Sequence, residues 1–241
     1  MTQVSKIAGA LIFTTALFGQ GFKSPVGPLT ETGFTKIFDG TLKGWDCDPN
    51  FWKAANGVMV GETTAEHQPP QNIFCIWKGG QPADFELKLD YRMTGAQTAN
   101  SGIQYRSVEM PEVAKWVLKG YQADIDMKQT YTGQVYEERG RAFLATRGQV
   151  VYVPNGGKPG AIGTSGDSDQ LKSFIKDADW NEIHIIARGN TLIQMINGHV
   201  TAMVIDDDAA NRKMSGFIGI QLHKTPAAMK MEVRNVRLKT F

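Results

Sequence analysis

Few cysteines and no common catalytic motif set the first limits on this 241-residue chain. Its two cysteines, Cys47 and Cys75, lack the CxxC spacing of zinc sites, so we expect no metal site built from them. In an oxidising compartment they would pair as a disulfide, and otherwise they would be two buried thiols; the spacing leaves both alternatives open. The metalloprotease HExxH, nucleophile-elbow GxSxG, Walker and Rossmann motifs are all missing.

An excess of charge of one sign is also lacking. Lys and Arg total 26 and Asp and Glu total 24, which leaves a formal net charge of +2. The basic residues are scattered and form no run, so we expect no binding to nucleic acid.

The only long apolar run, Ile7 to Phe18, lies at the N-terminus after Lys6. It is shorter than the about 20 residues of a spanning helix, and its form is typical of a secretory signal. We predict a signal peptide over residues 1–21, a linker over 22–33 and one domain over 34–241, in a protein that is exported to a periplasm or secreted. An uncleaved anchor is the alternative, and a buried helix is a weaker one. No later segment is apolar enough to span a membrane, so we expect no stable membrane insertion after cleavage.

Strand patterns and tight turns run through the rest of the chain. Apolar and polar residues alternate over short stretches, and Asn197-Gly198 is a strong hairpin signal. Strands without alternating helices predict an all-β sandwich or barrel. The Gly-rich stretch 154–170 predicts one long loop. The predicted strands cover residues 34–38, 57–61, 85–93, 101–107, 120–127, 180–188, 191–196, 199–205, 216–223 and 229–238.

Four of these strands carry polar residues on the face opposite their apolar residues, and the sets in 120–127 and 216–223 are unusual for a merely solvated face. Amides, short carboxylates and an imidazole suit oriented hydrogen bonds to hydroxyl groups, whereas Lys and Glu would suffice for solubility. We therefore predict that this sheet face binds a carbohydrate; a solvated face with cross-strand pairs is the alternative. The polar residues are Gln104 and Arg106 in 101–107, Gln122, Asp124 and Asp126 in 120–127, and Gln221 and His223 in 216–223. The fourth set, Glu86, Lys88, Asp90 and Arg92 in 85–93, alternates opposite charges and needs no ligand.

Two acids are followed closely by two arginines between Tyr136 and Arg141. An Arg beside a carboxylate keeps the carboxylate ionised, which suits either a catalytic base or a structural salt bridge. Glu138 is the candidate base in this stretch. Three aromatic residues could form sugar platforms or could simply pack: Trp77, Trp116 and Tyr131.

Several short motifs occur in a specific order over about residues 34–240. They are Ile37-Phe38-Asp39-Gly40, Leu42-Lys43-Gly44-Trp45, Asp84-Phe85-Glu86-Leu87, Asn100-Ser101-Gly102-Ile103, Gly120-Tyr121-Gln122, Trp180-Asn181-Glu182, Asn197-Gly198, Gly219-Ile220-Gln221-Leu222-His223 and Val233-Arg234-Asn235-Val236. Their joint order resembles that of the 3-keto-disaccharide hydrolase domain family, also called DUF1080.

This resemblance implies a concanavalin A-like jelly-roll sandwich of two antiparallel sheets that acts on glycosides oxidised at C3. The C3 ketone acidifies the proton on C2, so a base can form an enolate, the glycosidic oxygen leaves, and water then adds. A hydrogen-bond donor or a divalent metal ion would stabilise the enolate oxygen. A sugar oxidoreductase would act upstream to supply the ketone.

The resemblance also implies roles for individual residues. Asp124, Asp126 and Glu138 are candidate bases, and His223 is a candidate acid, base or metal ligand. The substrate would be bound by Gln104, Arg106, Gln122, Tyr136, Arg141 and Gln221.

Two other classes of function stay open at this point. One is a non-catalytic, lectin-like carbohydrate-binding module, and the other is a surface or scaffold protein. Convergence of Asp124, Asp126 or Glu138 with His223 in one pocket would favour an enzyme, whereas their separation would favour binding or scaffolding.

Overall fold

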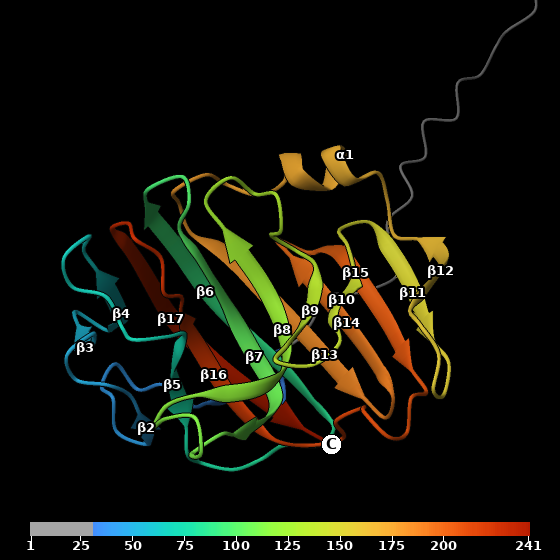
Figure 1. The fold of residues 1–241 in the computed structure, drawn as a ribbon, viewed down its shortest axis with the longest axis horizontal. Helices are drawn as coiled ribbons and strands as arrows, with labels where there is room; N and C mark the ends of the chain where they lie inside the picture. Colours follow the sequence, from blue (N-terminus) through green and yellow to red (C-terminus); the bar gives the residue numbers. More distant parts are fainter. Residues whose placement is uncertain (1–30) are drawn as a thin grey trace, which may run out of the picture. The chain divides into compact units, whose positions relative to one another are not determined.

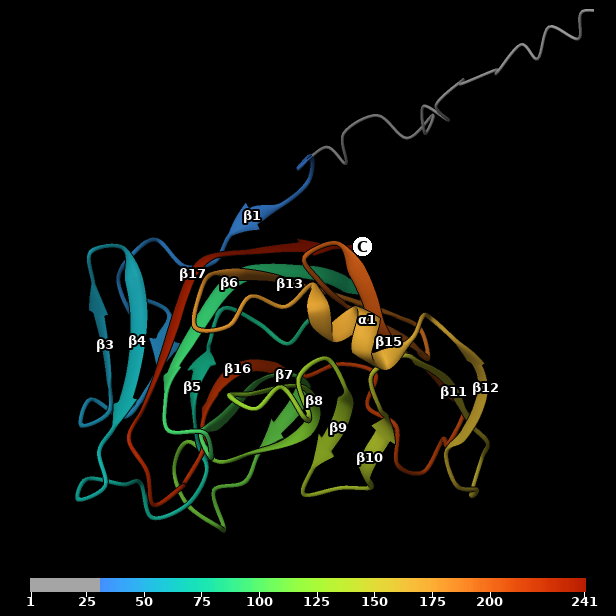
Figure 2. The ribbon, with the colours of Figure 1, turned by 90° about the horizontal axis from the view of Figure 1, so that it is seen from above.

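Two β-sheets stack face to face in the computed structural model, which describes residues 31–241 (Figures 1 and 2). The predicted signal peptide and residues 22–30 of the predicted linker lie outside the described residues. Within residues 31–241, no helix combines the length and the apolar character that crossing a membrane requires.

The larger sheet has ten strands. In spatial order they are β12 (Gly160–Thr164), β11 (Gln149–Val153), β15 (His199–Asp206), β14 (Thr191–Ile196), β13 (Asn181–Arg188), β6 (Phe85–Gly95), β17 (Met229–Thr240), β4 (Val58–Thr63) and β3 (Trp52–Ala55), with β1 (Thr35–Lys36) paired to β17.

The smaller sheet has seven strands and faces the viewer in Figure 1. In spatial order they are β10 (Ala142–Ala145), β9 (Val135–Glu138), β8 (Leu118–Asp126), β7 (Asn100–Glu109), β16 (Phe217–Leu222), β5 (Ile73–Trp77) and β2 (Trp45–Asp46).

The predicted sandwich of two antiparallel sheets is confirmed, with one local exception. β11 and β15 run parallel, while the other strand pairs of the described residues are antiparallel. The prediction of a single loop over 154–170 is wrong. This stretch contains β12, which pairs with β11 as an edge strand, and the start of helix α1 (Ser168–Ser173), which is capped by the Asp167 carboxylate.

The core lies between the two sheets and follows the period-2 pattern of the strands. In β6, Phe85, Leu87 and Leu89 are buried, and in β16, Ile218 and Ile220 are buried. Burial of each such side chain contributes about 1.5–3 kcal/mol, so the strands are held with these residues inward. The alternate residues of the smaller sheet therefore point away from the core.

A disulfide joins Cys47, just after β2, to Cys75 in β5. This is the first of the two alternatives that the sequence left open. The bond joins two residues with a sequence separation of 28. A disulfide that closes a loop of this size restricts the unfolded chain and thereby stabilises the fold by roughly 3 kcal/mol. It anchors the edge strand of the smaller sheet to β5.

Candidate functional site

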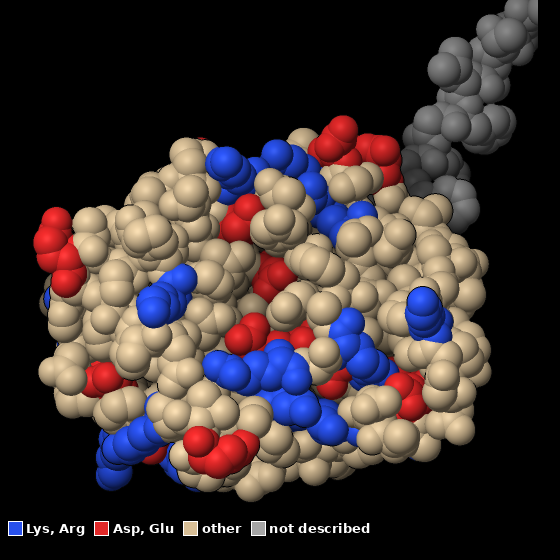
Figure 3. All heavy atoms as spheres, in the orientation of Figure 1, with Lys and Arg blue, Asp and Glu red and all other residues tan. Residues whose placement is uncertain are grey.

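A hollow with a volume of about 350 Å³ opens on the outer face of the smaller sheet. Acidic atoms are recessed in the middle of this face, over β8 and β9 (Figure 3). Seven residues predicted from the sequence line the hollow: Gln122, Asp124, Tyr131, Tyr136, Glu138, Gln221 and His223. Three more residues complete the lining: Asn72, Asn100 and Phe143.

Strand alternation places the polar residues of β8 in the hollow. Tyr121, Ala123 and Ile125 pack into the core, so Gln122 and Asp124 face outward. Gly102 of β7 lies opposite Asp124, and a Cβ at this position would come within 2.6 Å of the Gln122 side chain. The glycine thus leaves the space that the Gln122 amide occupies.

Side-chain amides surround the Asp124 carboxylate. Gln122 Nε2 donates to Asp124 Oδ1 at 2.6 Å, and Gln134 Nε2 donates to Oδ2 at 2.7 Å. The Gln122 Oε1 atom in turn accepts from Gln221 Nε2 at 3.1 Å and from Gln104 Nε2 at 3.3 Å. The floor of the hollow is therefore one connected hydrogen-bond network that ends on a carboxylate.

This environment raises the pKa of Asp124 to about 6. Burial is the largest cause, and the nearby charges of Glu138 and Asp126 also favour the protonated form. The hydrogen bonds from Gln134 and Gln122 act in the opposite direction because they stabilise the carboxylate. A carboxylate with this pKa can take up and release a proton near neutral pH.

Glu138 and His223 lie on another part of the lining. Asn72 Nδ2 donates to Glu138 Oε1 at 3.1 Å, while Asn72 Oδ1 accepts from the Lys224 N–H at 3.0 Å, so the amide is fixed at both ends. Burial lowers the pKa of His223, and the charge of Glu138 partly offsets this effect. The imidazole is therefore neutral at neutral pH and can accept a proton.

Three aromatic rings form a further part of the lining. The Tyr136 and Phe143 ring centroids are 5.1 Å apart, and those of Tyr131 and Phe143 are 6.0 Å apart. Tyr131 is 44% exposed and Phe143 is 51% exposed, which is unusual for rings of this size. Exposed rings beside oriented polar groups suit the C–H face and the hydroxyl groups of a sugar.

We expect Phe143→Ala to weaken glycoside binding by about 5- to 10-fold, because a ring contact contributes about 1 kcal/mol beyond simple burial. Titration calorimetry with a glycoside measures the affinity. Phe174→Ala is the matched control, since Phe174 is 36% exposed and stacks on His199 outside the lining of the hollow. Equal losses in the two variants would contradict a sugar contact at Phe143.

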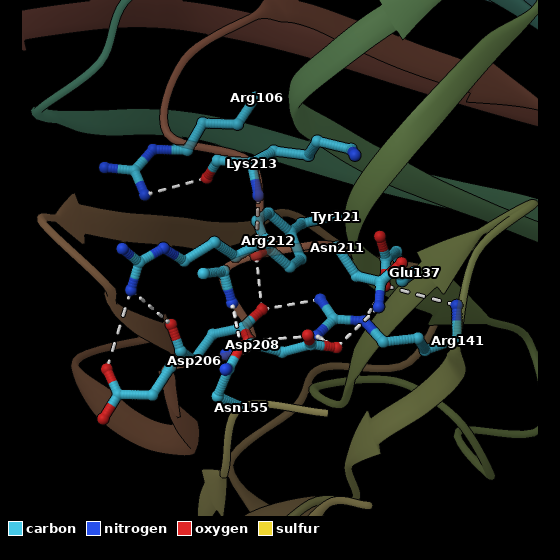
Figure 4. A network of polar contacts seen from close by, with 12 residues as sticks. Arg106, Tyr121, Glu137, Arg141, Asn155, Asp206, Asp208, Asn211, Arg212 and Lys213 are labelled. Carbon is cyan, nitrogen blue, oxygen red and sulfur yellow. Dashed lines mark hydrogen bonds and ion pairs between the residues drawn. The ribbon is translucent and has the colours of Figure 1, made fainter. Parts of the chain in front are cut away.

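Arg141 was predicted to bind substrate, but its guanidinium is engaged in a buried ion network (Figure 4). Arg141 Nε lies 2.5 Å from Glu137 Oε2, and Nη2 lies 2.6 Å from Asp206 Oδ2. Asp208 completes the group at 3.4 Å, and the Tyr121 hydroxyl donates to Asp206 at 2.5 Å. Alternation along β9 explains the difference, because Glu137 points toward this network while Glu138 points into the hollow.

Asp126 and Arg106 are also placed outside the lining. Asp126 accepts hydrogen bonds from the N–H groups of Thr130, Tyr131 and Thr132 at 2.8–3.0 Å, so its carboxylate holds the turn that carries Tyr131. Arg106 lies at a β-bulge with a φ of 47°, which breaks the alternation. Its guanidinium donates to three carbonyl groups, including that of Ala83 at 2.8 Å.

The remaining candidate residues lie beneath the lining of the hollow or outside it, with the exception of Tyr131. Gln104 lies beneath the lining and donates to Gln122. Of the three predicted platforms, only Tyr131 lines the hollow; Trp77 packs on the core, and Trp116 donates to Asp46 Oδ1 at 2.7 Å. Within residues 31–241, no group of three or more His, Cys, Asp or Glu side chains is placed to hold a metal ion.

Sequence reasoning missed four residues of this site. Asn72 precedes β5, and Phe143 lies in β10, neither of which was predicted as a strand. Asn100 lies just before the predicted strand 101–107, and Gln134 lies just before β9, which was not predicted either. No periodic pattern distinguishes these two residues. Only the pairing of distant strands brings these side chains to the hollow.

Comparison with known proteins gives a family and a fold. The sequence pattern of the 3-keto-alpha-glucoside-1,2-lyase-like domain matches residues 33–239. Two crystal structures of proteins from Parabacteroides distasonis, each titled a "putative glycosyl hydrolase", are similar in fold. The first is 17% identical with a TM-score of 0.56, over 86% of this chain and 99% of that chain. The second is 18% identical with a TM-score of 0.55, over 87% and 94%. No curated protein matches the chain.

Proposed function

Because this chain belongs to the 3-keto-alpha-glucoside-1,2-lyase-like domain family, we propose that its hollow cleaves the glycosidic bond of 3-keto-glycosides, 3-keto-disaccharides among them. The observation that carries the proposal is Asp124. It is a buried carboxylate with a pKa raised to about 6, and it faces a hollow that also holds Glu138 and His223. This is the convergence that favours an enzyme over a binding or scaffold protein.

In the first step, Asp124 removes the proton from C2 of the oxidised ring. The electron pair of the C2–H bond moves toward the C3 ketone, so negative charge develops on the ketone oxygen. The Tyr136 hydroxyl can stabilise this oxygen by donating a hydrogen bond. Burial and the charges of Glu138 and Asp124 raise the pKa of Tyr136, which keeps its hydroxyl protonated.

In the second step, the enolate re-forms the ketone, a C1–C2 double bond appears and the glycosidic oxygen leaves. His223 is assigned to this oxygen. Burial keeps most of the His223 imidazole neutral at neutral pH, so the smaller protonated fraction, which the charge of Glu138 favours, delivers the proton to the leaving group. Hydration follows the same path in reverse. Neutral His223 takes a proton from water, and the oxygen of this water adds to C1. Asp124 then returns its proton to C2. The net reaction is hydrolysis.

The substrate of this reaction must already carry a ketone at C3. We therefore propose that a sugar oxidoreductase acts before this protein. Export to a periplasm or to the medium is likewise part of the proposal, and it is supported by the apolar run near the N-terminus.

The test is release of sugar from a panel of 3-keto-glycosides and their unoxidised parents. We expect release only from the keto compounds, and a decrease of at least tenfold in the His223→Ala variant because the leaving oxygen loses its proton donor. Loss of release on addition of a chelator would add a divalent metal ion to the mechanism. No release from any compound, with sugar binding retained, would indicate a carbohydrate-binding protein instead.

We also expect kcat/KM on a 3-keto-glycoside to decrease about tenfold per pH unit below about pH 6, and to decrease again toward higher pH as His223 loses the proton that it must donate. Asp124 must be ionised to accept the C2 proton, and its pKa of about 6 sets the midpoint of this decrease. Initial rates at low substrate concentration between pH 4.5 and 8 measure the profile. The Phe143→Ala variant keeps Asp124 and should keep the midpoint, whereas a profile that is flat across pH 6 would remove Asp124 from the role of base.

A further inference from the structure

Gln221, in the lining of the hollow, has a buried hydrogen-bond acceptor that is left without a partner among the described residues. Its side chain is fully buried, yet it belongs to the lining. Its Nε2 atom donates to Gln122 Oε1 at 3.1 Å, whereas its Oε1 atom has no hydrogen-bond partner among the described residues. A buried carbonyl oxygen without a partner is costly, so this atom is suited to a group that arrives with the ligand.

The orientation of the Gln221 amide follows from the charge on Asp124. A carboxylate can only accept, so the two amides that bind it must each turn their Nε2 atom toward it, as Gln122 and Gln134 do. Gln122 then has its Oε1 atom on the other side, and both neighbours of this atom must donate. Gln104 and Gln221 do so through their Nε2 atoms, which leaves the Oε1 atom of Gln221 without a partner among the described residues.

We propose that Gln221 Oε1 accepts a hydrogen bond from one hydroxyl group of the bound glycosyl ring, and that the ketone of the substrate therefore lies elsewhere in the hollow. A ketone oxygen can only accept, so it cannot pair with another acceptor, whereas a hydroxyl group can donate. This assignment rests on the proposed function for the identity of the ligand. It makes Gln221 a specificity residue, which binds one hydroxyl group of the substrate and so fixes the orientation of the sugar ring.

The proposal predicts strong selection at a single position of the sugar. A ligand without that hydroxyl group would leave Gln221 Oε1 buried and unpaired, and sites of this kind reject such analogues strongly. We expect affinity to decrease by about 10- to 100-fold for one deoxy analogue. The analogue with fluorine at that position should lose as much, because fluorine cannot donate a hydrogen bond.

The experiment measures binding of methyl α-glucopyranoside and of its monodeoxy and monofluoro analogues by titration calorimetry. Wild type should discriminate at one position, and Gln221→Met should bind the parent compound about as weakly as wild type binds that analogue. Gln104→Met is the matched control. Gln104 is also fully buried and donates to the same Gln122 Oε1 atom, but it does not line the hollow, so this variant should keep the discrimination.

Three outcomes would overturn the assignment: discrimination that persists in Gln221→Met, a fluoro analogue that binds like the parent, or no binding of any glucoside to wild type. Thermal melting establishes that each variant is folded. Binding and cleavage are read separately. A wild type that binds with this pattern but releases no sugar from keto-glycosides would refute the proposed function and leave the role of Gln221 standing. Cleavage by wild type with unaltered discrimination in Gln221→Met would do the reverse.

Discussion

Asp124→Asn is expected to lower kcat/KM on 3-keto-glycosides by about 10²- to 10⁴-fold. Asparagine has nearly the shape of aspartate, but it cannot take up the C2 proton. The loss should appear in kcat and not mainly in KM, because the base acts on a substrate that is already bound. Single-turnover release of sugar separates the chemical step from binding.

The substitution also changes the amide floor in a defined way. Asp124 accepts from two Nε2 groups, and asparagine can accept only at its single oxygen, so Gln122 or Gln134 has to turn. A small loss of glycoside affinity is therefore expected beside the large loss of rate.

Asp90→Asn is the matched control for loss of a carboxylate. Asp90 lies in β6 of the larger sheet and binds Arg234 at 3.2 Å and Asn235 at 2.6 Å. This variant should keep its activity within about threefold, as expected for a change away from the reacting atoms. If Asp124→Asn also kept its activity within tenfold, Asp124 would not be the base, and Glu138 would be the next residue to test.

The long strands of this fold could be predicted from the sequence because each buries one face. The pattern in β6 and β13 alternates over most of their length, and their residues pair in the observed register, Leu87 with Ile185. The edge strands could not be predicted in this way. β12 is exposed along its whole length, and without burial on one face it has no period to detect.

The candidate site shows the same division. Alternation correctly placed Gln122 and Asp124 on one face of β8, and it placed Gln221 of β16 and His223, the residue after the end of β16, in the same hollow. Alternation does not show how a side chain is used. Asp126 shares the face of Asp124, yet three N–H groups of the following turn occupy it. These partners come from residues with no strand pattern of their own, so they are visible only in the structure.

Arg141→Met should lower the free energy of unfolding by about 3–5 kcal/mol, the cost of leaving buried charges without a partner. The guanidinium lies among the carboxylates of Glu137, Asp206 and Asp208, whose side chains are at most 3% exposed. Hydrogen bonds to Asp206 and Glu137 raise the pKa of Arg141 above its ordinary value although burial opposes its charge. Without Arg141, three carboxylates repel one another in a site that water hardly reaches. Urea unfolding at pH 7, followed by tryptophan fluorescence, measures the loss.

The substitution should also disturb the lining of the hollow, because Arg141 holds the turn between β9 and β10 in place. Arg139 and Ala142 both have left-handed backbone conformations, with φ of 57° and 63°, and such residues persist only where their surroundings hold them. The Arg141 N–H and guanidinium both bind the Glu137 carboxylate across this turn. The two strands that it joins carry Tyr136, Glu138 and Phe143 into the hollow. The variant that still folds at low temperature should therefore lose kcat as well as stability.

Arg92→Met is the control that separates a buried network from an ordinary ion pair. Arg92 binds both oxygens of Glu232 at 2.7 and 2.9 Å, but its side chain is 35% exposed. Glu232 is only 8% exposed, but it keeps Lys230 at 3.5 Å once Arg92 is gone, so this loss should stay at about 1 kcal/mol. A decrease in stability for Arg141→Met no larger than that for Arg92→Met would mean that the charges of Asp206 and Glu137 are tolerated without Arg141 as well as that of Glu232 is without Arg92. In that case the network could not hold the β9–β10 turn in place, and the position of Glu138 would have to depend on Asn72 alone.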